Sequence, residues 1–353
     1  MPPLERMIRE AIAAEGPMRL DRYMALCLGH PQHGYYMAHE PFGEHGDFVT
    51  APEISQMFGE LIGIWCVACW QAMGAPAGFN LVELGPGRGT LMADILRAAK
   101  VMPGFASAVR VHLVETSPRL RDMQEQAIGC RATWHDALAS VPEAPAILIA
   151  NEFFDAIAIH QFERRDGRWH ERCVGLDGEK LVIGLSAAEV EGQGAPGKDG
   201  DVIELAPARV DIALEIGARL ARNPGAALII DYGHLVSAPG DTLQALRQHA
   251  HVPVTQAPGE CDLTSHVDFA ALAKALRNGG AAVWPALTQR AFLLAMGIEA
   301  RVAVLAAKAD APTRDILQRA LTRLADQAQM GNLFKVLAAT SPGLATPYPF
   351  GAR

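Results

Sequence analysis

Apolar side chains follow helical spacing in the first 75 residues of the chain. Leu4, Met7, Ile8 and Ala11 share one face of a predicted helix, and a longer helical pattern covers residues 54–73. From residue 79 to residue 150, short apolar runs alternate with helical patterns. This β-α-β alternation predicts an α/β fold with a doubly wound parallel sheet and helices on both faces. The expected strands are residues 79–84, 109–115, 131–135 and 146–150.

The apolar period changes to two between residues 157 and 204, which predicts antiparallel strands. Asp166-Gly167 and Asp177-Gly178 separate these strands, and Asp-Gly is a strong signal for a hairpin turn. We therefore expect an antiparallel β insertion over residues 157–205. A helix, a strand, a variable loop, a helix, a strand, further helices and a closing strand follow. They are expected over residues 208–222, 226–231, 233–260, 267–277, 281–284, 290–328 and 333–340.

Length and composition are those of an ordinary globular protein. The chain has 353 residues, half of them hydrophobic, and a formal net charge of −8. The negative charge disfavours nucleic acid as the main partner. We expect a helical N-terminal extension over residues 1–75, followed by a main α/β domain over residues 76–353 that carries the β insertion.

The sequence contains few signals for a cellular compartment or for attachment to a membrane. No apolar run approaches the roughly 20 residues of a membrane span. The first ten residues carry acids and lack the apolar centre of a signal peptide. Cys66 and Cys69 lie inside a helical apolar pattern and are expected to be core thiols. We expect a cytoplasmic protein, or a mitochondrial-matrix protein in a eukaryote, although no transit peptide is seen. A dimer is one oligomeric state that the sequence leaves open.

The most informative stretch follows the first strand of the parallel sheet and reads Glu83-Leu-Gly85-Pro-Gly87-Arg-Gly89. Glycines let the backbone turn tightly and approach a ligand closely. A dinucleotide fingerprint would instead read G-x-G-x-x-G, with a pyrophosphate at the helix N-terminus. Glu83 would repel a pyrophosphate but suits a cation. S-adenosylmethionine carries a sulfonium and an ammonium and has no phosphate, so we expect it as the cofactor.

Two further acids follow the next strands. Glu115 ends the second strand, where a carboxylate accepts hydrogen bonds from the ribose hydroxyls of an adenosyl cofactor. Asp136 follows the third strand and could accept from the adenine amino group. The alternative for Asp136 is an N-cap of the next helical segment, and both roles are compatible.

The run Asn151-Glu-Phe-Phe-Asp-Ala156 follows the fourth strand, where an acceptor should meet the cofactor. A carboxylate can grip a guanidinium bidentately, and aromatic faces favour a cation. Glu152 and Asp155 are therefore our candidates for binding and orienting an arginine. The alternative is that Phe153 and Phe154 belong to the core and the acids to a solvated turn.

Two loops complete the candidate site. Residues 46–56 are expected to form a lid over the cofactor, although Thr50 and Ser55 could simply cap helices. In the second loop, Ser265 and Asp268 resemble a capping box. His266 would then remove a proton from the acceptor or belong to the cap without any chemistry. Of the twelve histidines, four lie within residues 30–45 without metal-ligand spacing, so no metal site is expected.

Taken together these motifs resemble the MidA-like S-adenosylmethionine-dependent methyltransferases over nearly the whole chain. The resemblance rests on motifs from every region of the sequence. They are His30-Pro-x-His-Gly-Tyr-Tyr36, Gly46-Asp-Phe-x-Thr-Ala-Pro-Glu-Ile-Ser55, the glycine loop, Asn151–Ala156, Asp231-Tyr-Gly233, Asp262-Leu-Thr-x-His-Val-Asp-Phe269 and Met330-Gly-x-Leu-Phe-Lys-Val336.

The resemblance implies a class I methyltransferase fold, a Rossmann-like sheet of seven strands whose last strand is antiparallel. It also implies methylation of an arginine on a partner protein, which in mitochondria is a core subunit of respiratory complex I. Thr50, Pro52, Glu53 and Asn151 are the cofactor residues that it adds. Residues 241–258 look looser than in the family, which affects the expected substrate more than the fold.

Two other functions remain open at this point. The chain could methylate a small molecule, which a closed apolar pocket would favour. It could also be an assembly protein that has kept the fold without the activity, in which case it would not bind the cofactor. A dehydrogenase is disfavoured because the third glycine comes one residue too early.

Overall fold

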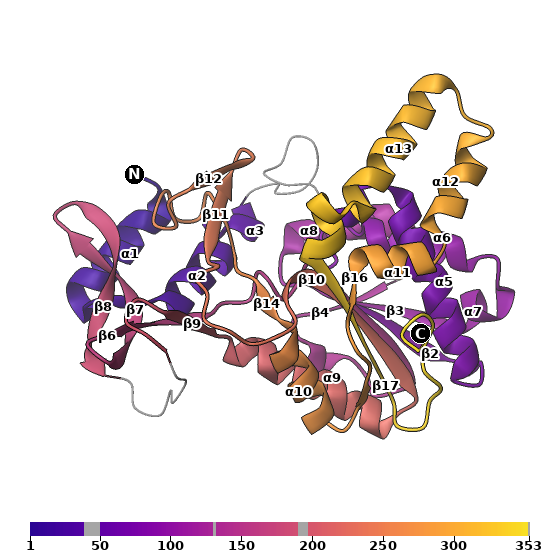
Figure 1. Ribbon diagram of the computed structural model, residues 1–353, viewed down its shortest axis with the longest axis horizontal. Coiled ribbons are helices and arrows are strands. Elements are labelled where there is room, and N and C mark those ends of the chain that lie inside the picture. Colours follow the sequence, from indigo (N-terminus) through magenta and orange to yellow (C-terminus); the bar gives the residue numbers. More distant parts are fainter. Residues whose placement is uncertain (39–49, 130–131, 190–196, 352–353) are drawn as a thin grey trace. The chain divides into compact units, whose positions relative to one another are not determined.

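The computed structural model of the chain describes residues 1–38, 50–129, 132–189 and 197–351 (Figure 1). By their internal contacts they form two compact units. The larger unit takes its residues from Val49–Phe154, Val210–Val236 and Val267–Arg353, and the smaller from Met1–Phe48, Asp155–Arg209 and Ser237–His266. The sequence predicts a boundary near residue 75. In the structure, residues 50–75 belong to the larger unit, and the β insertion shares a unit with the N-terminal helices.

The larger unit is built on one sheet, with the strand order β15-β17-β10-β5-β2-β3-β4 among the described residues. The pairs from β10 through β4 are parallel, whereas β17 is antiparallel to β10 and β15. This confirms the predicted fold class, with two short strands, β14 and β16, added at the sides. The bounds are β2 Phe79–Leu84, β3 Val109–Val114, β4 Ala132–His135, β5 Ala146–Asn151, β10 Gly225–His234, β14 Val267–Asp268, β15 Ala282–Val283, β16 Leu287–Thr288 and β17 Phe334–Thr340.

Helices cover both faces of this sheet, so every residue of β2 is buried. Phe79 and Leu81 join a core with α5 and α6, while Val82 and Leu84 join a second core with α9 and α10. The alternating side chains of this fully buried strand thus contribute to two cores, one on each face of the sheet. The helices of the larger unit are α4 Ala51–Ile54, α5 Gln56–Ala72, α6 Thr90–Ala99, α7 Pro103–Ala108, α8 Pro118–Ile128, most of α9 Pro207–Arg222, α10 Phe269–Asn278, α11 Gln289–Ala295, α12 Ile298–Ala306 and α13 Ala311–Ala325, with the short turns η1 Leu138–Ser140 and η2 Gln327–Gly331.

Helices α5 and α6 pack closely because α5 has glycines on the shared face. A Cβ on Gly59 would lie 2.4 Å from Cβ of Asp94, and a Cβ on Gly63 would lie 2.9 Å from the carbonyl oxygen of Ile95. Real Cβ atoms do not approach other atoms so closely, so a larger residue would push α6 away. This packing fixes the helix that follows the glycine loop. Cys66 and Cys69 lie buried in the same core, as predicted.

The smaller unit contains an antiparallel sheet with the order β1-β7-β6-β9, and β8 pairs with β7. Helices α1 and α2 bury Leu4, Ile8 and Tyr23 in a core that they share with Val174 of β7 and Leu263. The bounds are α1 Pro3–Glu15, β1 Met18–Arg19, α2 Leu20–Gly29, α3 Tyr35–Ala38, β6 His160–Arg165, β7 Arg168–Asp177, β8 Lys180–Glu189 and β9 Val202–Leu205.

The two Asp-Gly signals of the insertion have different outcomes. Arg165 pairs with Arg168, and Asp166 and Gly167 both have positive φ, so the first two-residue turn is confirmed. Asp177, however, pairs with Lys180, which makes Gly178 and the residue after it the turn. The second turn is therefore one residue later than predicted.

The expectation of a variable loop over residues 233–260 is wrong for much of its length. β11 Gln244–Arg247 pairs with β12 Ala250–Val252 on one side and with β13 Asp262–Thr264 on the other. The turn between β11 and β12 consists of Gln248 and His249, with φ of 51° and 62°. Neither is the Gly, Asn or Asp that normally marks such a turn.

The predicted capping box at Ser265 is also wrong. The backbone N–H of Ala271 donates to the side chain of Asp268 at 3.0 Å, so Asp268 is the N-cap of α10, which begins at Phe269. A capping box needs the helix to begin just after Ser265, but Val267 and Asp268 continue the extended chain as β14.

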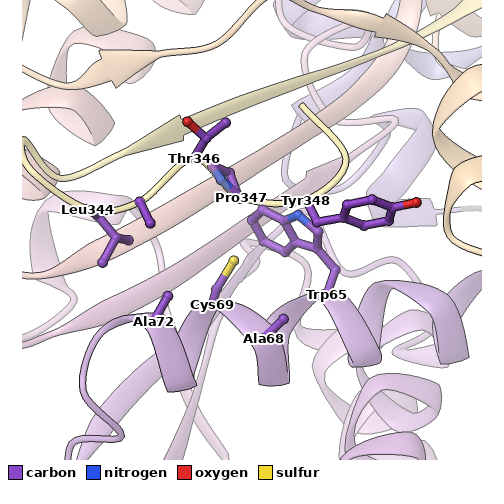
Figure 2. Close-up of a pocket in the computed structure, with 9 residues that line it drawn as sticks. Trp65, Ala68, Cys69, Ala72, Leu344, Thr346, Pro347 and Tyr348 are labelled. Carbon is purple, nitrogen blue, oxygen red and sulfur yellow. The ribbon is translucent and has the colours of Figure 1, made fainter. Parts of the chain in front are cut away.

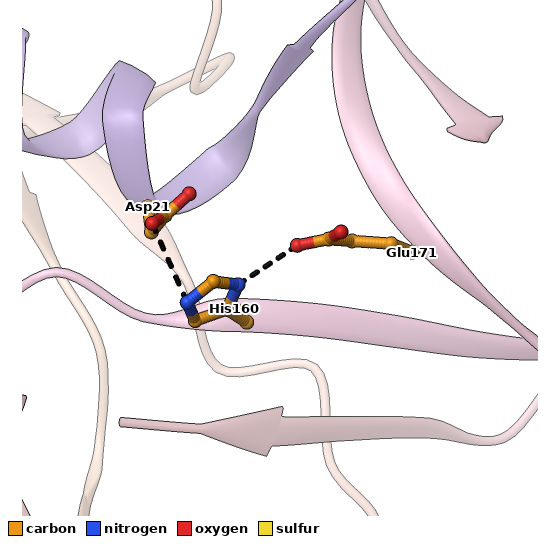
Figure 3. Close-up of side chains that lie close together, drawn as sticks. All are labelled: Asp21, His160 and Glu171. Carbon is orange, nitrogen blue, oxygen red and sulfur yellow. Dashed lines mark hydrogen bonds and ion pairs between the residues drawn. The ribbon is translucent and has the colours of Figure 1, made fainter. Parts of the chain in front are cut away.

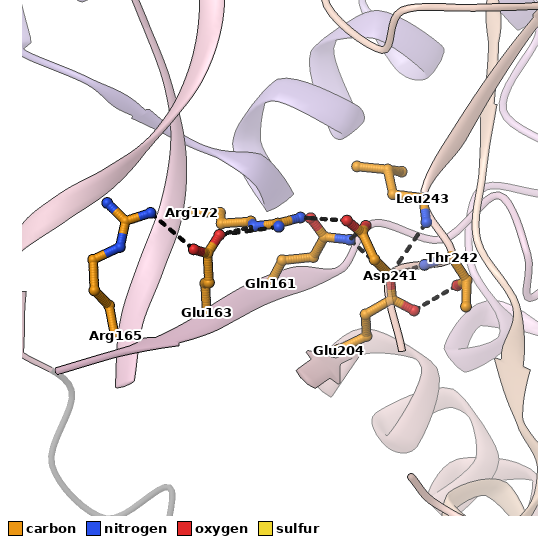
Figure 4. A network of polar contacts seen from close by, with 8 residues as sticks. All are labelled: Gln161, Glu163, Arg165, Arg172, Glu204, Asp241, Thr242 and Leu243. Atoms are coloured by element: carbon orange, nitrogen blue, oxygen red, sulfur yellow. Dashed lines mark hydrogen bonds and ion pairs between the residues drawn. The ribbon is translucent and has the colours of Figure 1, made fainter. Parts of the chain in front are cut away.

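A polar network fixes the segment before β11 to the insertion sheet (Figure 4). Gln161 of β6 donates to Asp241 at 2.9 Å, and Arg172 of β7 donates to the same carboxylate at 2.7 Å. Glu204 of β9 accepts from the backbone N–H groups of Thr242 and Leu243. Five hydrogen bonds to carboxylates, including one from the hydroxyl of Thr242 to Glu204, thus hold the start of the segment that looked loose in sequence.

Candidate active site

The carboxyl ends of the parallel strands meet at one edge of the larger unit's sheet. The glycine loop follows β2, Glu115 follows β3, Asp136 follows β4, and Glu152 follows β5. Four predicted cofactor or acceptor segments therefore share this edge.

The glycine loop is a tight turn into the N-terminus of α6. Gly85, Gly87 and Gly89 have φ of 62°, 54° and 84°. A Cβ on Gly85 would lie 2.7 Å from the ring of Phe153, and one on Gly89 would lie 3.1 Å from Cα of Gln124. The loop therefore needs glycine for its backbone angles and for its neighbours. It presents backbone and a helix N-terminus to this edge, which suits an anionic group such as a carboxylate.

Glu83 is buried inside β2, with only 2% of its surface exposed. Its Oε2 has no hydrogen-bond partner among the described residues. Burial raises the pKa of Glu83 to about 8, so the carboxyl is mostly protonated at neutral pH. Glu83 is therefore a neutral acid until a cation approaches it, and not the negative charge expected from the sequence.

Gln124 of α8 links the side chain of Glu115 to the glycine loop and to β4. The Nε2 group of Gln124 donates to the carbonyl of Gly87 at 2.8 Å and lies 3.3 Å from Oε2 of Glu115. Its Oε1 accepts from the indole of Trp134 at 2.8 Å. Gln124 is fully buried, and burial also raises the pKa of Glu115. One amide thus connects the glycine loop, the candidate ribose acid and β4.

Asp136 lies at the same edge but is exposed, with 85% of its side chain accessible. Its carboxylate accepts from Arg121 at 2.5 Å, and the guanidinium of Arg121 also bonds the carbonyl of Glu115. Ala137 is the N-cap of the turn η1, and Asp136 is not, so the capping alternative is wrong. The adenine role of Asp136 stays a prediction.

The described part of the expected lid, from Thr50 onward, bonds to the glycine loop. Glu53 accepts from the hydroxyl of Thr90 at 2.5 Å and lies 3.8 Å from the guanidinium of Arg88. Pro52 is buried. Ser55 accepts from the N–H of Met57 and caps α5, whereas Thr50 makes no capping bond through its side chain. Residues 46–49 of the predicted lid lie outside the described residues.

Glu152 joins the same cluster from the end of β5. Its Oε1 accepts from the backbone N–H of Ala51 at 3.0 Å and from the side chain of Asn151 at 3.1 Å. Its φ is 49°, a left-handed conformation that costs a non-glycine residue on the order of 1 kcal/mol. Strain of this kind persists where the surroundings enforce it. Residues 50–53, 85–90 and 151–152 therefore form one connected cluster.

The two phenylalanines after Glu152 belong to the core rather than to a cation site. Phe154 is fully buried, and its N–H donates to the buried carboxylate of Asp231 at 3.0 Å. Phe153 packs against the same core and over Gly85. The acids beside them, Glu152 and Asp155, are not a solvated turn, because one is half-buried and the other buried.

Asp155 and His266 belong to the smaller unit, whereas Glu152 belongs to the larger. The carbonyl of Asp155 accepts from the N–H of Ser265 at 3.1 Å, and the N–H of His266 donates to Thr242 at 2.9 Å. Since Asp268 caps α10, the capping alternative for His266 is wrong. Its role in proton removal stays a prediction.

Tyr36 and Asp262 lie near Asp155 within the smaller unit. The hydroxyl of Tyr36 donates to Asp262 at 2.9 Å. Burial raises the pKa of Tyr36 well above its usual value, and the negative charges of Asp262 and Asp155 raise it further. Both carboxylates are themselves buried.

Comparison with known proteins decides the family. A family model described as "Putative S-adenosyl-L-methionine-dependent methyltransferase" matches residues 61–286. The chain belongs to this family. S-adenosyl-L-methionine is the cofactor that the family uses, and its donor chemistry is transfer of a methyl group from a sulfonium.

The methyltransferase has relatives that match nearly its whole length. It is 37% identical to "Protein arginine methyltransferase NDUFAF7 homolog, mitochondrial" of Drosophila melanogaster, over 95% of this chain and 84% of that protein. It is 34% identical to the Homo sapiens protein of similar name, over 95% and 83%. A crystal structure from Burkholderia thailandensis, bound to S-adenosyl-homocysteine, matches with a TM-score of 0.85 at 28% identity, covering 97% of this chain and 92% of that one.

The strand-end residues of the methyltransferase fit an adenosyl cofactor. Gly85 and Gly89 let the loop backbone pack closely against Phe153 and Gln124 while it turns into α6. Glu83 and Asn151 each have a buried oxygen without a hydrogen-bond partner among the described residues. Buried polar atoms normally have partners, so two such acceptors beside a glycine cradle suit the ammonium or hydroxyl groups of a ligand.

An apolar pocket lies elsewhere on the methyltransferase (Figure 2). Trp65, Cys69 and Ala72 of α5 face residues 344–348 across it. β17 is antiparallel to β10, and its last residue Thr340 pairs with Ala226 near the start of β10. The segment after β17 therefore begins at the opposite edge of the sheet from the strand ends, and this pocket is not the methyl-transfer site.

Asp21, His160 and Glu171 form a cluster with possible metal ligands (Figure 3). Nδ1 of His160 lies 2.8 Å from Glu171, and Nε2 lies 3.4 Å from Asp21. Both ring nitrogens face carboxylates, and Arg19 also bonds Asp21. We assign the cluster to the packing of α2 on β6 and β7. His39 and His45 lie outside the described residues. No helix in the described residues is long and apolar enough to cross a membrane.

Sequence reasoning missed Gln124, Arg121 and Tyr36, which hold the predicted residues in place. Gln124 and Arg121 lie three residues apart in α8, whose exposed positions are largely polar. The polar pattern of such a helix does not mark which side chain turns inward. Tyr36 was quoted within a motif, but only the fold brings it to Asp262, 226 residues away.

Proposed function

We propose that this methyltransferase transfers a methyl group from S-adenosylmethionine to an arginine side chain of a partner protein. The observation that carries the proposal is its match, along 95% of the chain, to relatives named protein arginine methyltransferase. The buried or half-buried acids Glu152 and Asp155 support it, because a guanidinium is bound well by carboxylates.

In this proposal the cofactor is held by the strand-end cluster of the larger unit. The glycine loop and the N-terminus of α6 take its methionine carboxylate, and Glu83 and Asn151 take its ammonium through their unpartnered oxygens. Glu115 takes the ribose and Asp136 the adenine. Thr50, Pro52 and Glu53 close over it from the lid segment. When bound, S-adenosylmethionine supplies a methyl group that is open to in-line attack.

The acceptor arginine needs its charge localised, because a guanidinium is protonated at every physiological pH and its nitrogens are poor nucleophiles. Glu152 and Asp155 bind its N–H groups and turn one nitrogen toward the methyl. His266 accepts the proton that this nitrogen loses. Most of the rate enhancement comes from holding the nitrogen and the methyl in line.

The acceptor protein and the compartment remain predictions. A core subunit of respiratory complex I is the acceptor that the family resemblance implies. The curated relatives are named as mitochondrial proteins. We expect this chain in the cytoplasm, or in the matrix in a eukaryote.

The test compares protein methylation in wild-type cells and cells that lack this gene. Mass spectrometry of whole-cell digests should find methylarginine peptides that disappear in the deletion and return with the wild-type gene. The variant Glu152→Gln should not restore them, although calorimetry should show that it binds S-adenosylhomocysteine. Loss of a methylated small molecule alone, with all methylarginine peptides intact, would overturn the proposal. A wild-type protein that binds no S-adenosylhomocysteine would favour a silent assembly factor.

A further inference from the structure

Arg209 lies at the start of α9 and is 97% buried, since only 3% of its surface is exposed. A guanidinium carries five N–H donors and is rarely buried without partners. Here the partners come from two segments of the smaller unit that are far apart in sequence. They are residues 155–157 and residues 265–266.

The contacts of Arg209 are mainly with backbone carbonyls. Nη2 donates to the carbonyl of Asp155 at 3.0 Å and to that of Ile157 at 2.9 Å, and Nε donates to Ile157 at 3.2 Å. Nη1 donates to the carbonyl of His266 at 2.9 Å, and Nη2 also donates to the hydroxyl of Ser265 at 2.6 Å. A single planar group thus fixes the main chain of two residues that the proposed function gives to the acceptor.

The geometry points to Arg209 as the positioning residue for the acceptor side of methyl transfer. This inference rests on the proposed function, because it concerns Asp155 and His266. Arg209 sets the main chain from which both side chains project, and it does not touch the acceptor itself.

A lysine lacks the planar guanidinium group with its several N–H donors. A lysine at position 209 keeps the positive charge but has one nitrogen, so it cannot span carbonyls on both segments. Loosening these segments by about 1 Å would lower the transfer rate by about 100-fold, because in-line attack tolerates little displacement. Cofactor binding depends on the strand-end cluster and should not change.

Arg219 on the same helix provides a matched control. It donates to the carbonyls of Val141 and Leu138 at 3.0 and 2.8 Å and to Glu215 at 3.1 Å, all within the larger unit. Arg219→Met therefore removes bonds of the same kind without touching residues 155–157 or 265–266. Comparing the two positions separates positioning from a general loss of stability.

The experiment uses the full chain, tritiated S-adenosylmethionine as donor and the protein extract of the deletion strain as acceptor. We expect Arg209→Lys to lower the saturating rate of arginine labelling about tenfold and Arg209→Met about 100-fold. The Kd for S-adenosylhomocysteine should stay within about twofold of wild type in both. Arg219→Met should lower the melting temperature by a similar amount, with a labelling rate near that of wild type.

The outcomes separate the two proposals. If the wild-type protein labels no arginine in the extract, the proposed function fails. If it labels arginine and Arg209→Lys does so at the same saturating rate, the positioning role of Arg209 is wrong. An equal loss of rate in Arg219→Met, or a parallel loss of cofactor affinity in the Arg209 variants, would also reduce Arg209 to a purely structural residue.

Discussion

The internal contacts of the strand-end region in the larger unit differ from those around Arg209 in the smaller unit. At the strand ends of the larger unit, side chains such as Glu53, Gln124 and Glu152 bond to nearby loops, and each loop has several partners. In the smaller unit, Arg209 bonds to two distant segments, which the backbone bond from Ser265 to Asp155 also joins. The cofactor region should therefore weaken stepwise when single residues change. The acceptor region should depend heavily on one residue.

This difference also divides the chemistry. The strand-end region has glycines, a neutral buried acid and backbone groups, which we assign to the cofactor, and it also has Glu152, which we assign to the acceptor. The region of Asp155 has a second carboxylate, a phenol and a half-buried histidine nearby in sequence or space. Substitutions can therefore separate binding from transfer, and the predictions below use that separation.

The largest effect is expected at Glu152. Glu152→Gln keeps the shape and both hydrogen-bonding positions but removes the charge that would bind a guanidinium. We expect methyl transfer to fall at least about 100-fold, in line with losing a group that stabilises the reacting nitrogen. The affinity for S-adenosylhomocysteine, measured by calorimetry, should change little. Glu299→Gln, at an exposed position of α12, is the control. An active Glu152→Gln would remove Glu152 from the mechanism.

Gln124→Leu should instead weaken the binding of S-adenosylhomocysteine. It removes the donor to Gly87 and Glu115 and leaves the indole of Trp134 without its acceptor. Losing buried hydrogen bonds of this kind costs about 2 kcal/mol, or roughly 30-fold in the Kd for S-adenosylhomocysteine. Gln126→Leu, on an exposed position of the same helix, should bind normally. Equal Kd values for the two variants would show that Gln124 does not support the cofactor site.

Glu83 gives a pH test of the neutral acid in the cofactor region. Burial raises its folded-state pKa to about 8 from the usual 4.5, so the folded protein holds the proton more tightly than the unfolded chain does. The stabilisation is complete below pH 4.5 and is lost as the pH rises towards 8. The slope is about 1 kcal/mol per pH unit within this window.

Urea denaturation at several pH values between 5 and 8 would measure this slope. The difference in unfolding free energy between Glu83→Gln and wild type should then shift in favour of the variant as the pH rises. A constant difference across the window would mean that Glu83 is ionised in the folded protein, as the sequence argument assumed.

The smallest effect is expected at the N-cap of α10, which follows the acceptor region in the chain. Asp268→Ala removes the bond to the N–H of Ala271 and should lower the unfolding free energy by about 0.5 to 1 kcal/mol. Chemical denaturation measures it directly. Asp315→Ala, at an exposed position inside α13, is the comparison variant and should have almost no effect. If the two variants unfolded alike, the cap would contribute nothing.

Sequence patterns predicted the fold best for a strand that is buried on both faces. β2 was predicted with its observed bounds, because four of its six residues are apolar and glycine follows it directly. The hairpin of β11 and β12 was missed because Gln248 and His249 adopt positive φ without glycine or asparagine. The first turn of α10 was misplaced because Ser265 satisfies a local capping pattern, while its hydroxyl in fact binds Arg209.

The candidate site was predictable to the extent that its residues follow strand ends. Glu115, Asp136 and Glu152 were found by that rule. Gln124 and Arg209 were not, because each is a polar residue of a helix whose neighbours in sequence say nothing about its burial. The protonation of Glu83 was also beyond the sequence, since the pKa depends on packing by α5 and the neighbouring strands.

The smaller unit is assembled from three segments of the chain that are far apart in sequence, so it cannot be completed until the last segment has been synthesised. The hydroxyl of Tyr23 donates to the carbonyl of Val254, 231 residues later. At 5–20 residues per second, a ribosome needs roughly 10 to 50 s to make that distance. The apolar faces of α1 and α2 meet Val174 earlier but must wait that long for the last of their partners. We expect a nascent-chain chaperone to bind them in the interval, so ribosome profiling of chaperone-bound chains should show early engagement that ends after about residue 264 has left the exit tunnel.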